Sequence, residues 1–497
     1  MSGRRKSGVL LHPTSLPGPG GIGSLGKECL CFIDALRQAG QTLWQVLPLG
    51  PVTYGNSPYS CYSAFAGNPL LIDLEALVEE GDLVPEDLQS GFSEDRVDFD
   101  RVLVYKSALL RRAGDNFLSE SGGDTPRKEG FRRFCDTSPW LHDYALFRAV
   151  KEAHGEKSWR QWPDAIARRT SEAVEEYSKK LYAEVDVHKY IQWQFFRQWR
   201  TIREYANRYG IGIIGDIPIF VAYDSADVWA NPQLFHLDER GGPLVVAGVP
   251  PDYFSETGQL WGNPLYNWEV MAFQGYSWWI ERMRCALGLY DQVRIDHFRG
   301  FEAHWEVPAT EKTAINGRWV KGPGKALFNA LIDALGPLPI IAEDLGVITP
   351  DVEALRDCFG FPGMKILQFA FGSGPGNIYL PHNYNTHAAV YTGTHDNDTS
   401  IGWFAAISAE ERRHVLDYLG CGEDDIAWSL IRTVLASVAD TCIIPLQDLL
   451  SLDGQARMNL PGVAMNNWGW RYKSGDITEA ALSRLRFLTE LYGRLNH

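Results

Sequence analysis

The chain has few of the features that mark a secreted or a membrane protein. Its eight cysteines are scattered over 497 residues, and no two of them form a Cys-x-x-Cys pair. So few thiols in so long a chain favour a reducing compartment and indicate neither a disulfide framework nor a zinc motif. The apolar run behind Arg4, Arg5 and Lys6 stops at Leu11, far short of the roughly 20 residues that span a membrane. We therefore expect a cytoplasmic protein without a membrane partner.

Basic residues are also scarce. Lysine and arginine total 47 against 62 aspartates and glutamates, which gives a formal net charge of −15. This balance argues against a nucleic-acid groove, which needs a dense basic surface. With 45% hydrophobic and 22% charged residues the composition is that of a globular protein, and the length predicts about three domains or one large barrel with insertions.

Aromatic residues, in contrast, are abundant. The chain contains 17 Trp, 21 Tyr and 23 Phe. Large flat rings pack protein cores, and they also stack on the faces of sugars, so this richness is compatible with both uses.

Short apolar runs, rich in residues that favour β-strands, recur along the chain with helix-length segments between them. They cover residues 8–11, 42–48, 212–217, 292–296, 338–343, 364–369, 389–392 and 441–445. Strands covered by helices on both faces are apolar throughout, and eight such strands are typical of a parallel barrel. We predict an α/β fold, a (β/α)8 TIM barrel with a large mainly helical insertion after the second strand and irregular loop insertions at the C-terminal face.

Two gaps between these runs are too long for one helix, and they define the predicted domains. We expect the first part of the barrel in 1–72, a mainly helical insertion in 73–205 and the third strand in 206–221. Residues 222–279, rich in Pro, Gly, Trp and Asn, are predicted to be an irregular insertion with an active-site lid, and 280–497 to complete the barrel with C-terminal helices.

Three acids follow predicted strands, at the end of a barrel where active sites are built. Asp296 shares a strand face with Arg294, whose guanidinium favours the ionised carboxylate that a nucleophile needs. A purely structural ion pair is the alternative. Glu343 leaves an apolar strand, where desolvation raises a carboxyl pKa towards that of a proton donor. A helix cap is the alternative there, and the adjacent Asp344 is expected to point away and cap the following segment.

The third acid, Asp396, lies in a polar loop beside His395. A hydrogen bond from this histidine to a substrate hydroxyl is one interpretation. A metal site is the other, with candidate ligands His297, His304, His395 and Asp398, although the chain has neither a His-x-His pair on a strand nor a His-Glu-x-x-His helix.

Further polar and aromatic residues are expected at the same mouth. Asp216 ends the third predicted strand, and Tyr54 and Tyr59 follow the second. Residues 248–264 alternate rings with proline and glycine, which suits a lid. Paired carboxylates without a phosphate-binding loop fit glycosyl transfer at an acetal carbon.

Several long motifs then occur in a familiar order. They begin with Leu10-Leu-His-Pro-Thr-Ser-Leu-Pro and continue through Trp44-Gln-Val-Leu-Pro-Leu-Gly-Pro, Arg294-Ile-Asp-His-Phe-Arg-Gly, Ala342-Glu-Asp-Leu-Gly and Gly393-Thr-His-Asp-Asn. In these motifs the chain resembles, essentially from end to end, the amylomaltase family of 4-α-glucanotransferases, which includes the plant disproportionating enzyme.

The resemblance implies a role for each candidate residue. Asp296 would be the nucleophile, Glu343 the general acid/base, and Asp396 would hold hydroxyls of the sugar at the cleaved bond. The substrate-binding residues implied by the family are Asp216, Arg294, His395, Tyr59 and Ser57 near that sugar, Phe254, Gln259 and Trp261 in the lid, and Tyr54 at a more remote glucan contact.

The implied reaction is disproportionation through a covalent glucosyl-enzyme intermediate with retention of configuration. The donor would be an α-1,4-glucan or maltooligosaccharide, and the acceptor the 4-hydroxyl of glucose or of another maltooligosaccharide. No cofactor is implied, and the oligomeric state stays open. A hydrolase on the same barrel, a non-catalytic glucan-binding barrel and a metal-dependent hydrolase are the alternatives.

Overall fold

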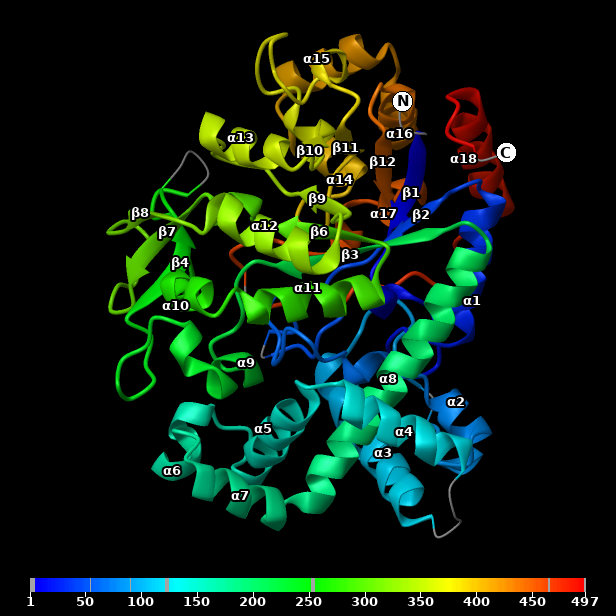
Figure 1. Cartoon of the computed structure of the whole chain (residues 1–497). Helices are drawn as coiled ribbons and strands as arrows, with labels where there is room; N and C mark the ends of the chain where they lie inside the picture. The colour runs from blue at the N-terminus through cyan, green and yellow to red at the C-terminus, as the bar shows by residue number, and fades with distance from the viewer. Residues whose placement is uncertain are drawn as a thin grey trace.

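A parallel barrel forms the centre of the molecule (Figure 1). The computed structural model describes residues 5–53, 55–89, 91–120, 125–251, 255–463 and 465–495. The barrel strands are β1 (Lys6–Leu10), β2 (Leu43–Gln45), β3 (Gly212–Pro218), β6 (Gln292–Asp296), β9 (Ile340–Ala342), β10 (Gly363–Ile366), β11 (Ala388–Tyr391) and β12 (Thr441–Pro445). Consecutive strands pair in parallel from β1 to β9 and from β10 to β12, and β12 pairs with β1.

The barrel closes between β9 and β10. There the Ala342 N–H donates to the carbonyl of Pro362 over 2.9 Å, just before β10 begins. Each of the eight apolar runs in the sequence lies on one of these strands, and side chains such as Val293 and Ile295 are fully buried. The parallel pairing of the eight strands confirms the predicted (β/α)8 barrel. The strands are mainly apolar because both of their faces are enclosed.

Helices surround the barrel. They are α1 (Lys27–Gln38), α11 (Ser277–Leu289), α12 (Gly324–Leu335), α13 (Pro350–Cys358), α14 (Ser400–Ala406), α15 (Ala409–Leu419), α16 (Ile426–Ala436), α17 (Leu446–Leu449) and α18 (Glu479–Leu491). Between β10 and β11, a fully described segment, only the 3-10 helices η7 (Leu367–Phe369) and η8 (Pro381–Asn383) occur. Within the described ranges, no helix combines the length and the apolar content needed to cross a membrane.

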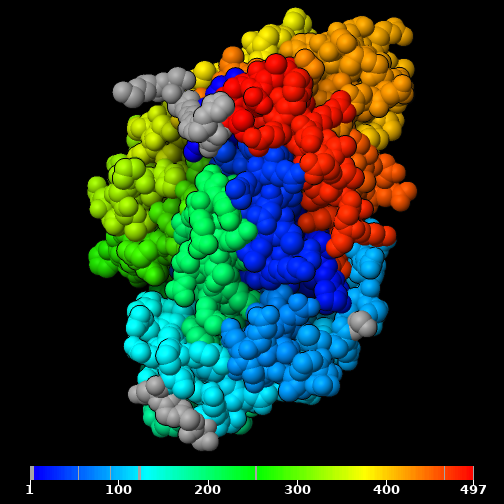
Figure 2. Space-filling model, turned by 90° about the vertical axis from the view of Figure 1, so that its right-hand side faces the viewer, coloured from blue at the N-terminus to red at the C-terminus, as the bar shows by residue number. Residues whose placement is uncertain are grey.

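A helical lobe between β2 and β3 forms one end of the molecule, opposite the C-terminal barrel helices (Figures 1 and 2). Its helices are α2 (Leu74–Glu79), α3 (Phe99–Ser119), α4 (Pro126–Thr137), α5 (Leu141–Ala153), α6 (Asp164–Ala167), α7 (Ser171–Lys180) and α8 (Tyr182–Arg208). The last of these also packs on the barrel, where the Trp199 indole N–H donates to the Leu289 carbonyl over 2.9 Å. Barrel and lobe consequently share one apolar core.

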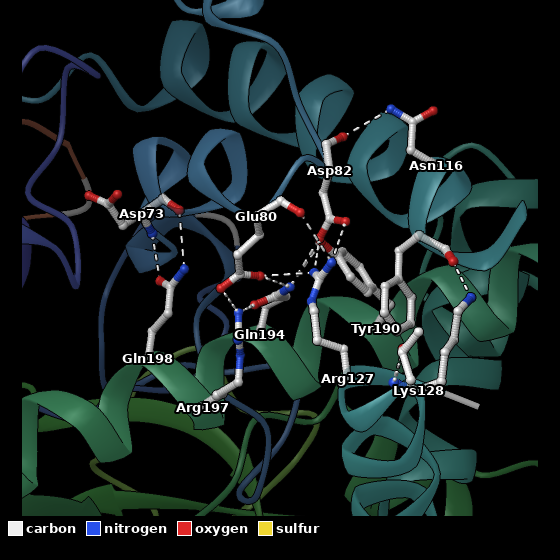
Figure 3. A network of polar contacts seen from close by, with 12 residues as sticks. Asp73, Glu80, Asp82, Asn116, Arg127, Lys128, Tyr190, Gln194, Arg197 and Gln198 are labelled. Carbon is white, nitrogen blue, oxygen red and sulfur yellow. Dashed lines mark hydrogen bonds and ion pairs between the residues drawn. The ribbon is translucent and has the colours of Figure 1, made fainter. Parts of the chain in front are cut away.

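A partly buried polar network, centred on the buried Asp82 in the loop after α2, joins that loop to helices α4 and α8 of this lobe (Figure 3). The carboxylate of Asp82 accepts hydrogen bonds from the Tyr190 hydroxyl over 2.6 Å and from the guanidinium of Arg127. Glu80 pairs with Arg127 and Arg197. Buried charges of opposite sign that meet in this way avoid the large cost of an isolated buried ion, so the network fixes α4 against α8.

A second, antiparallel sheet lies beside the barrel. Its order is β5 (Gln259–Pro264), β4 (Val245–Val249), β7 (Ala303–Pro308) and β8 (Arg318–Lys321). The sequence predicted irregular structure over 222–279, and the structure instead has two strands there, together with α9 (Ala226–Ala230) and α10 (Trp268–Phe273). The β4 strand pairs with β7, which follows barrel strand β6 in the sequence. A pairing between strands so far apart in the chain cannot be recognised from the local sequence.

Candidate active site at the barrel mouth

Arg294 is the centre of the site. It lies on β6, two residues before Asp296, so both side chains project from one strand face, as alternation requires. Its Nη1 donates to Asp216 Oδ2 over 2.6 Å, and its Nη2 donates to Asp296 Oδ1 over 3.0 Å. One buried guanidinium thus connects carboxylates from β3 and β6.

Asp296 is at the carboxyl end of β6, and its side chain keeps 30% of its surface exposed. Burial raises the pKa of this carboxyl, and the negative charges of Glu343, Asp216 and Asp396 raise it further, whereas Arg294 lowers it. The resultant shift is upward. The protonation of Asp296 therefore depends on the charges of its neighbours as well as on its own burial.

Glu343 follows β9 directly and is held by the backbone. Its Oε2 accepts the N–H of His297 over 2.7 Å, and its Oε1 accepts the N–H of Leu345 over 2.8 Å. Burial raises the pKa of Glu343, while Arg294 and the two N–H groups oppose that shift. The carboxyl is thus desolvated but fixed in direction, with both oxygens already in contact with donors.

The neighbouring Asp344 does not cap the next segment as the sequence predicted. Its Oδ1 accepts the N–H of Met364 on β10 over 2.7 Å, and its Oδ2 pairs with Arg356 on α13. A buried carboxylate beside a closing strand is better satisfied by this cation and this N–H than by the start of a helix. Asp344 therefore ties β9 to β10, away from the mouth.

Asp396 comes from the loop after β11 and is half exposed, at 49% of its side chain. Its Oδ1 lies 3.4 Å from Nε2 of His395 and accepts the amide N–H of Asn459 over 2.6 Å. Burial lowers the pKa of His395, although Asp396 opposes that change. The imidazole is consequently neutral near pH 7, so it does not offer Asp396 a positive charge.

Tyr59 contacts both Asp216 on β3 and His395 in the loop after β11. Its hydroxyl donates to Asp216 Oδ2 over 2.8 Å and lies 3.5 Å from Nδ1 of His395. Its ring stacks on the imidazole of His395, with the centroids 4.9 Å apart and the planes 18° from parallel. Ser57 contacts the backbone of Tyr59, since its Oγ accepts the N–H of Tyr59 over 3.3 Å.

The predicted lid carries Trp261 on β5, with 38% of the residue exposed. Its indole N–H donates to Gln259 over 3.1 Å, and its ring meets the imidazole of His297 edge-on at 4.8 Å. Trp261 therefore contacts the residue that directly follows Asp296 in the chain. The predicted site residues Tyr54 and Phe254 lie outside the described residues.

Some buried polar atoms at the mouth lack partners in the described part of the chain. They include Asp216 Oδ1 and His297 Nε2. His297 also has a φ of 54°, a backbone conformation that is uncommon for residues other than glycine. Asp216 borders a cavity of about 60 Å³, large enough for a few water molecules. Unfilled hydrogen-bonding capacity and backbone strain of this kind concentrate at ligand sites.

The alternative metal interpretation has no matching cluster. No three His, Cys, Asp or Glu side chains within the described ranges lie close enough together to hold a metal ion. Burial lowers the pKa of His297 to about 3 and that of His304 to about 4, so both rings are neutral near pH 7.

Sequence reasoning missed the residues that reach Asp396 from the loop after β12. Besides Asn459, they are Arg457, whose Nη2 donates to the Asp396 carbonyl over 2.6 Å, and Trp468, whose ring lies 5.8 Å from that of His395. They belong to no predicted strand end and to no motif with a known chemical pattern. Only the tertiary fold brings them to the site.

With this geometry in place, comparisons with known proteins define the class. The sequence model of the 4-alpha-glucanotransferase family matches residues 11–478. The chain is 54% identical to a 4-alpha-glucanotransferase of Synechocystis sp. and 51% identical to one of Thermus thermophilus, and each match covers 99% of both chains. The potato protein, described as chloroplastic or amyloplastic, is 48% identical over 99% of this chain and 87% of its own.

The structure agrees with the sequence matches. It is similar to amylomaltase from Streptococcus agalactiae in complex with acarbose, with a TM-score of 0.96, 41% identity, and coverage of 99% of this chain and 100% of that one. The chain belongs to the 4-alpha-glucanotransferase family. It is thus a glycosyltransferase built on a (β/α)8 barrel.

Proposed function

We propose that the enzyme transfers segments of α-1,4-glucan to the 4-hydroxyl of glucose or of another maltooligosaccharide, through a covalent intermediate with retained configuration. The observation that carries this proposal is the contact of one guanidinium, Arg294, with Asp296 and Asp216 beside a desolvated Glu343. Two carboxyls of different environment on either side of a scissile bond are what retaining glycosyl transfer requires.

Asp296 is the nucleophile in this proposal. Arg294 donates to it directly, so the guanidinium stabilises the carboxylate form that attacks the anomeric carbon. The raised pKa of Asp296 has a chemical use, since a more basic carboxylate is a better nucleophile once it is ionised.

Glu343 is the proton donor to the departing oxygen and afterwards the base for the acceptor. The N–H groups of His297 and Leu345 set its direction, and a bound glucan that expels water raises its pKa further. The proton it gives to the leaving group in the first step returns from the acceptor hydroxyl in the second step.

The remaining polar residues hold the sugar. Asp396, His395 and Asp216 are placed to bind hydroxyls of the ring whose bond is cleaved, and Tyr59 offers a ring face beside them. Interactions that strengthen as the ring flattens towards the oxocarbenium-like transition state would supply part of the rate. Gln259, Ser57, Tyr54 and Phe254 complete the proposed substrate-binding set.

The lid decides between transfer and hydrolysis. Water and a sugar hydroxyl attack the same intermediate, so the site must exclude water until an acceptor binds. Trp261 is placed for this task, since its ring covers His297 next to Asp296. The proposed reaction needs no cofactor, because the bond broken in the donor conserves the free energy of the bond formed. The expected cytoplasmic location stays a prediction.

Incubation with maltotriose tests the proposed reaction. Chromatography of the products should show glucose together with a ladder of longer maltooligosaccharides, and a separate count of reducing ends should stay constant. A rise in reducing ends without a ladder would instead define a hydrolase and would contradict the proposed role of the lid. Binding of glucan without any product would contradict the assignment of the three acids.

A further inference from the structure

The carboxylate of Asp396 is held by residues 457–459, which come from the loop after the last barrel strand. The amide of Asn459 donates to Oδ1 of Asp396 over 2.6 Å, and Nη2 of Arg457 donates to the backbone carbonyl of Asp396 over 2.6 Å. The N–H of Asn459 also donates to the carbonyl of His395 over 3.1 Å. Three hydrogen bonds therefore join this segment to the loop that carries the acid.

The segment is itself held in place. Nε of Arg457 donates to the carbonyl of Asn459 over 2.8 Å, and the N–H of Trp468 donates to the carbonyl of Met458 over 2.7 Å. The ring of Trp468 is buried beside the stacked rings of Tyr59 and His395, at 6.0 Å and 5.8 Å from their centroids. Asn459 is thus a fixed donor and not a mobile surface side chain.

Asp396 depends on such a donor more than the other acids do. Its side chain is half exposed, whereas Arg294 makes direct contact with Asp296 and backbone N–H groups hold Glu343. Its other neighbour, His395, is a neutral ring. The Asn459 bond occupies Oδ1, and among the described residues no hydrogen bond reaches Oδ2.

We propose that Asn459, supported by Arg457, is a positioning residue that fixes Oδ1 of Asp396 and presents Oδ2 to a hydroxyl of the bound sugar. This inference rests on the proposed function, in which Asp396 binds the sugar at the cleaved bond. A carboxylate free to rotate would meet the hydroxyl in only part of its orientations, and a misplacement of about 1 Å at a reacting centre costs on the order of 100-fold in rate.

A double-mutant cycle tests the proposal. Asn459→Ala and Asp396→Ala are made singly and together, and transfer from maltotriosyl fluoride, an activated donor, keeps the residual rates measurable. We expect Asn459→Ala to lower kcat by roughly 10- to 100-fold with little change in KM. In the Asp396→Ala background the same change should add less than about twofold, because the group through which it acts is gone.

Two further variants separate positioning from folding. Asn459→Asp keeps the side-chain shape but sets a like charge against Asp396, so it should lose at least as much activity as Asn459→Ala. Asn207→Ala is the matched control, since Asn207 also donates to an aspartate, over 3.3 Å to Asp291, on the outside of the barrel. It should keep the activity of the unmodified enzyme.

The outcomes distinguish this inference from the proposed function. If Asp396→Ala transfers glucan as fast as the unmodified enzyme, the proposed role of Asp396 fails. If Asp396→Ala is impaired but Asn459→Ala and Asn459→Asp keep full kcat, only the positioning role fails. Equal losses from Asn459→Ala in both backgrounds would likewise overturn it, because they would show an action independent of Asp396.

Discussion

Two partly buried polar networks of this molecule use the same residue types with opposite results. In the helical lobe, the carboxylates of Glu80 and Asp82 meet the guanidinium groups of Arg127 and Arg197, and all four carboxylate oxygens accept hydrogen bonds (Figure 3). At the barrel mouth the guanidinium of Arg294 contacts two carboxylates, Asp216 and Asp296, and the charges of Glu343 and Asp396 also act on Asp296.

The difference separates structural from chemical use of charge. Balanced charges in the lobe lock helices together. At the mouth, burial and neighbouring negative charges raise the pKa of Asp296, and Asp216 Oδ1 has no hydrogen-bond partner among the described residues. Unbalanced charge that makes a site reactive also lowers the stability of the folded protein. The two networks should therefore respond to substitution in opposite ways.

The largest effect is expected from Asp296→Asn. The amide cannot attack the anomeric carbon, so kcat for transfer should fall by about 10⁴-fold or more while the fold is kept. Initial rates with maltotriose measure the loss. Asp291→Asn, at the opposite end of the same strand, is the control and should change kcat less than about twofold. Retention of more than a tenth of the rate by Asp296→Asn would contradict its role as nucleophile.

In the lobe, Asp82→Asn should lower stability and spare catalysis. The change removes the Asp82 charge from Arg127, which keeps its ion pair with Glu80 at 2.9 Å, so the unfolding free energy should fall by about 1–3 kcal/mol. Denaturant titration gives the free energy, and kcat per folded molecule should stay unchanged. A loss of kcat at full stability would mean that the lobe network serves the site and not the fold.

The reverse effect on stability is expected at the mouth. The pKa of Asp296 is higher in the folded protein than the usual value of 3.8. The unfolding free energy therefore falls as pH rises from 3.8 to the folded-state pKa, and above that pKa the loss of stability is complete. Asp296→Asn removes this cost, so it should stabilise the protein at neutral pH by about 1–2 kcal/mol and have little effect below pH 3.8.

The control for this pH dependence is Asp164→Asn in an exposed pair with Arg168, which should change stability by less than about 0.5 kcal/mol at either pH. Destabilisation by Asp296→Asn at neutral pH would show that the Arg294 contact outweighs burial, and that the mouth is balanced like the lobe.

The smallest effect concerns the lid. Trp261→Ala should let water reach the intermediate and lower the ratio of transfer to hydrolysis by about 3- to 10-fold, with a minor change in donor consumption. Reducing-end counts against product ladders give the ratio. Trp319→Ala, an exposed tryptophan on β8 of the same sheet, is the matched control. An unchanged ratio in Trp261→Ala would remove this residue from the exclusion of water.

Much of the barrel could be predicted because its signal is local. Runs such as 389–392 are mainly apolar, and in 292–296 strand alternation places Arg294 beside Asp296 without any tertiary knowledge. The acids at strand ends follow from the same rule. The long motifs also predicted the family, and the comparisons confirm it. The roles that the resemblance implies for these residues stay predictions.

The rest depends on contacts distant in sequence. The pairing of β4 with β7, the bond of Asp344 to Met364 and the hold of Asn459 on Asp396 join residues from different barrel loops. Each of these residues has several possible partners in the sequence, and only the closed barrel selects one. The balanced network of the lobe was equally unpredictable, since Asp82 lies in the loop after α2 and Arg127 lies 45 residues later, on α4.

The most direct test of the account is to trap the covalent intermediate. A maltosyl fluoride that lacks the terminal 4-hydroxyl can glycosylate the enzyme but cannot act as an acceptor, so in the absence of other sugars the intermediate should accumulate. Mass spectrometry of the digested protein should then find the added sugar on the peptide containing Asp296, and not in Asp296→Asn. Donor turnover without any adduct, or an adduct on another residue, would contradict the central claim.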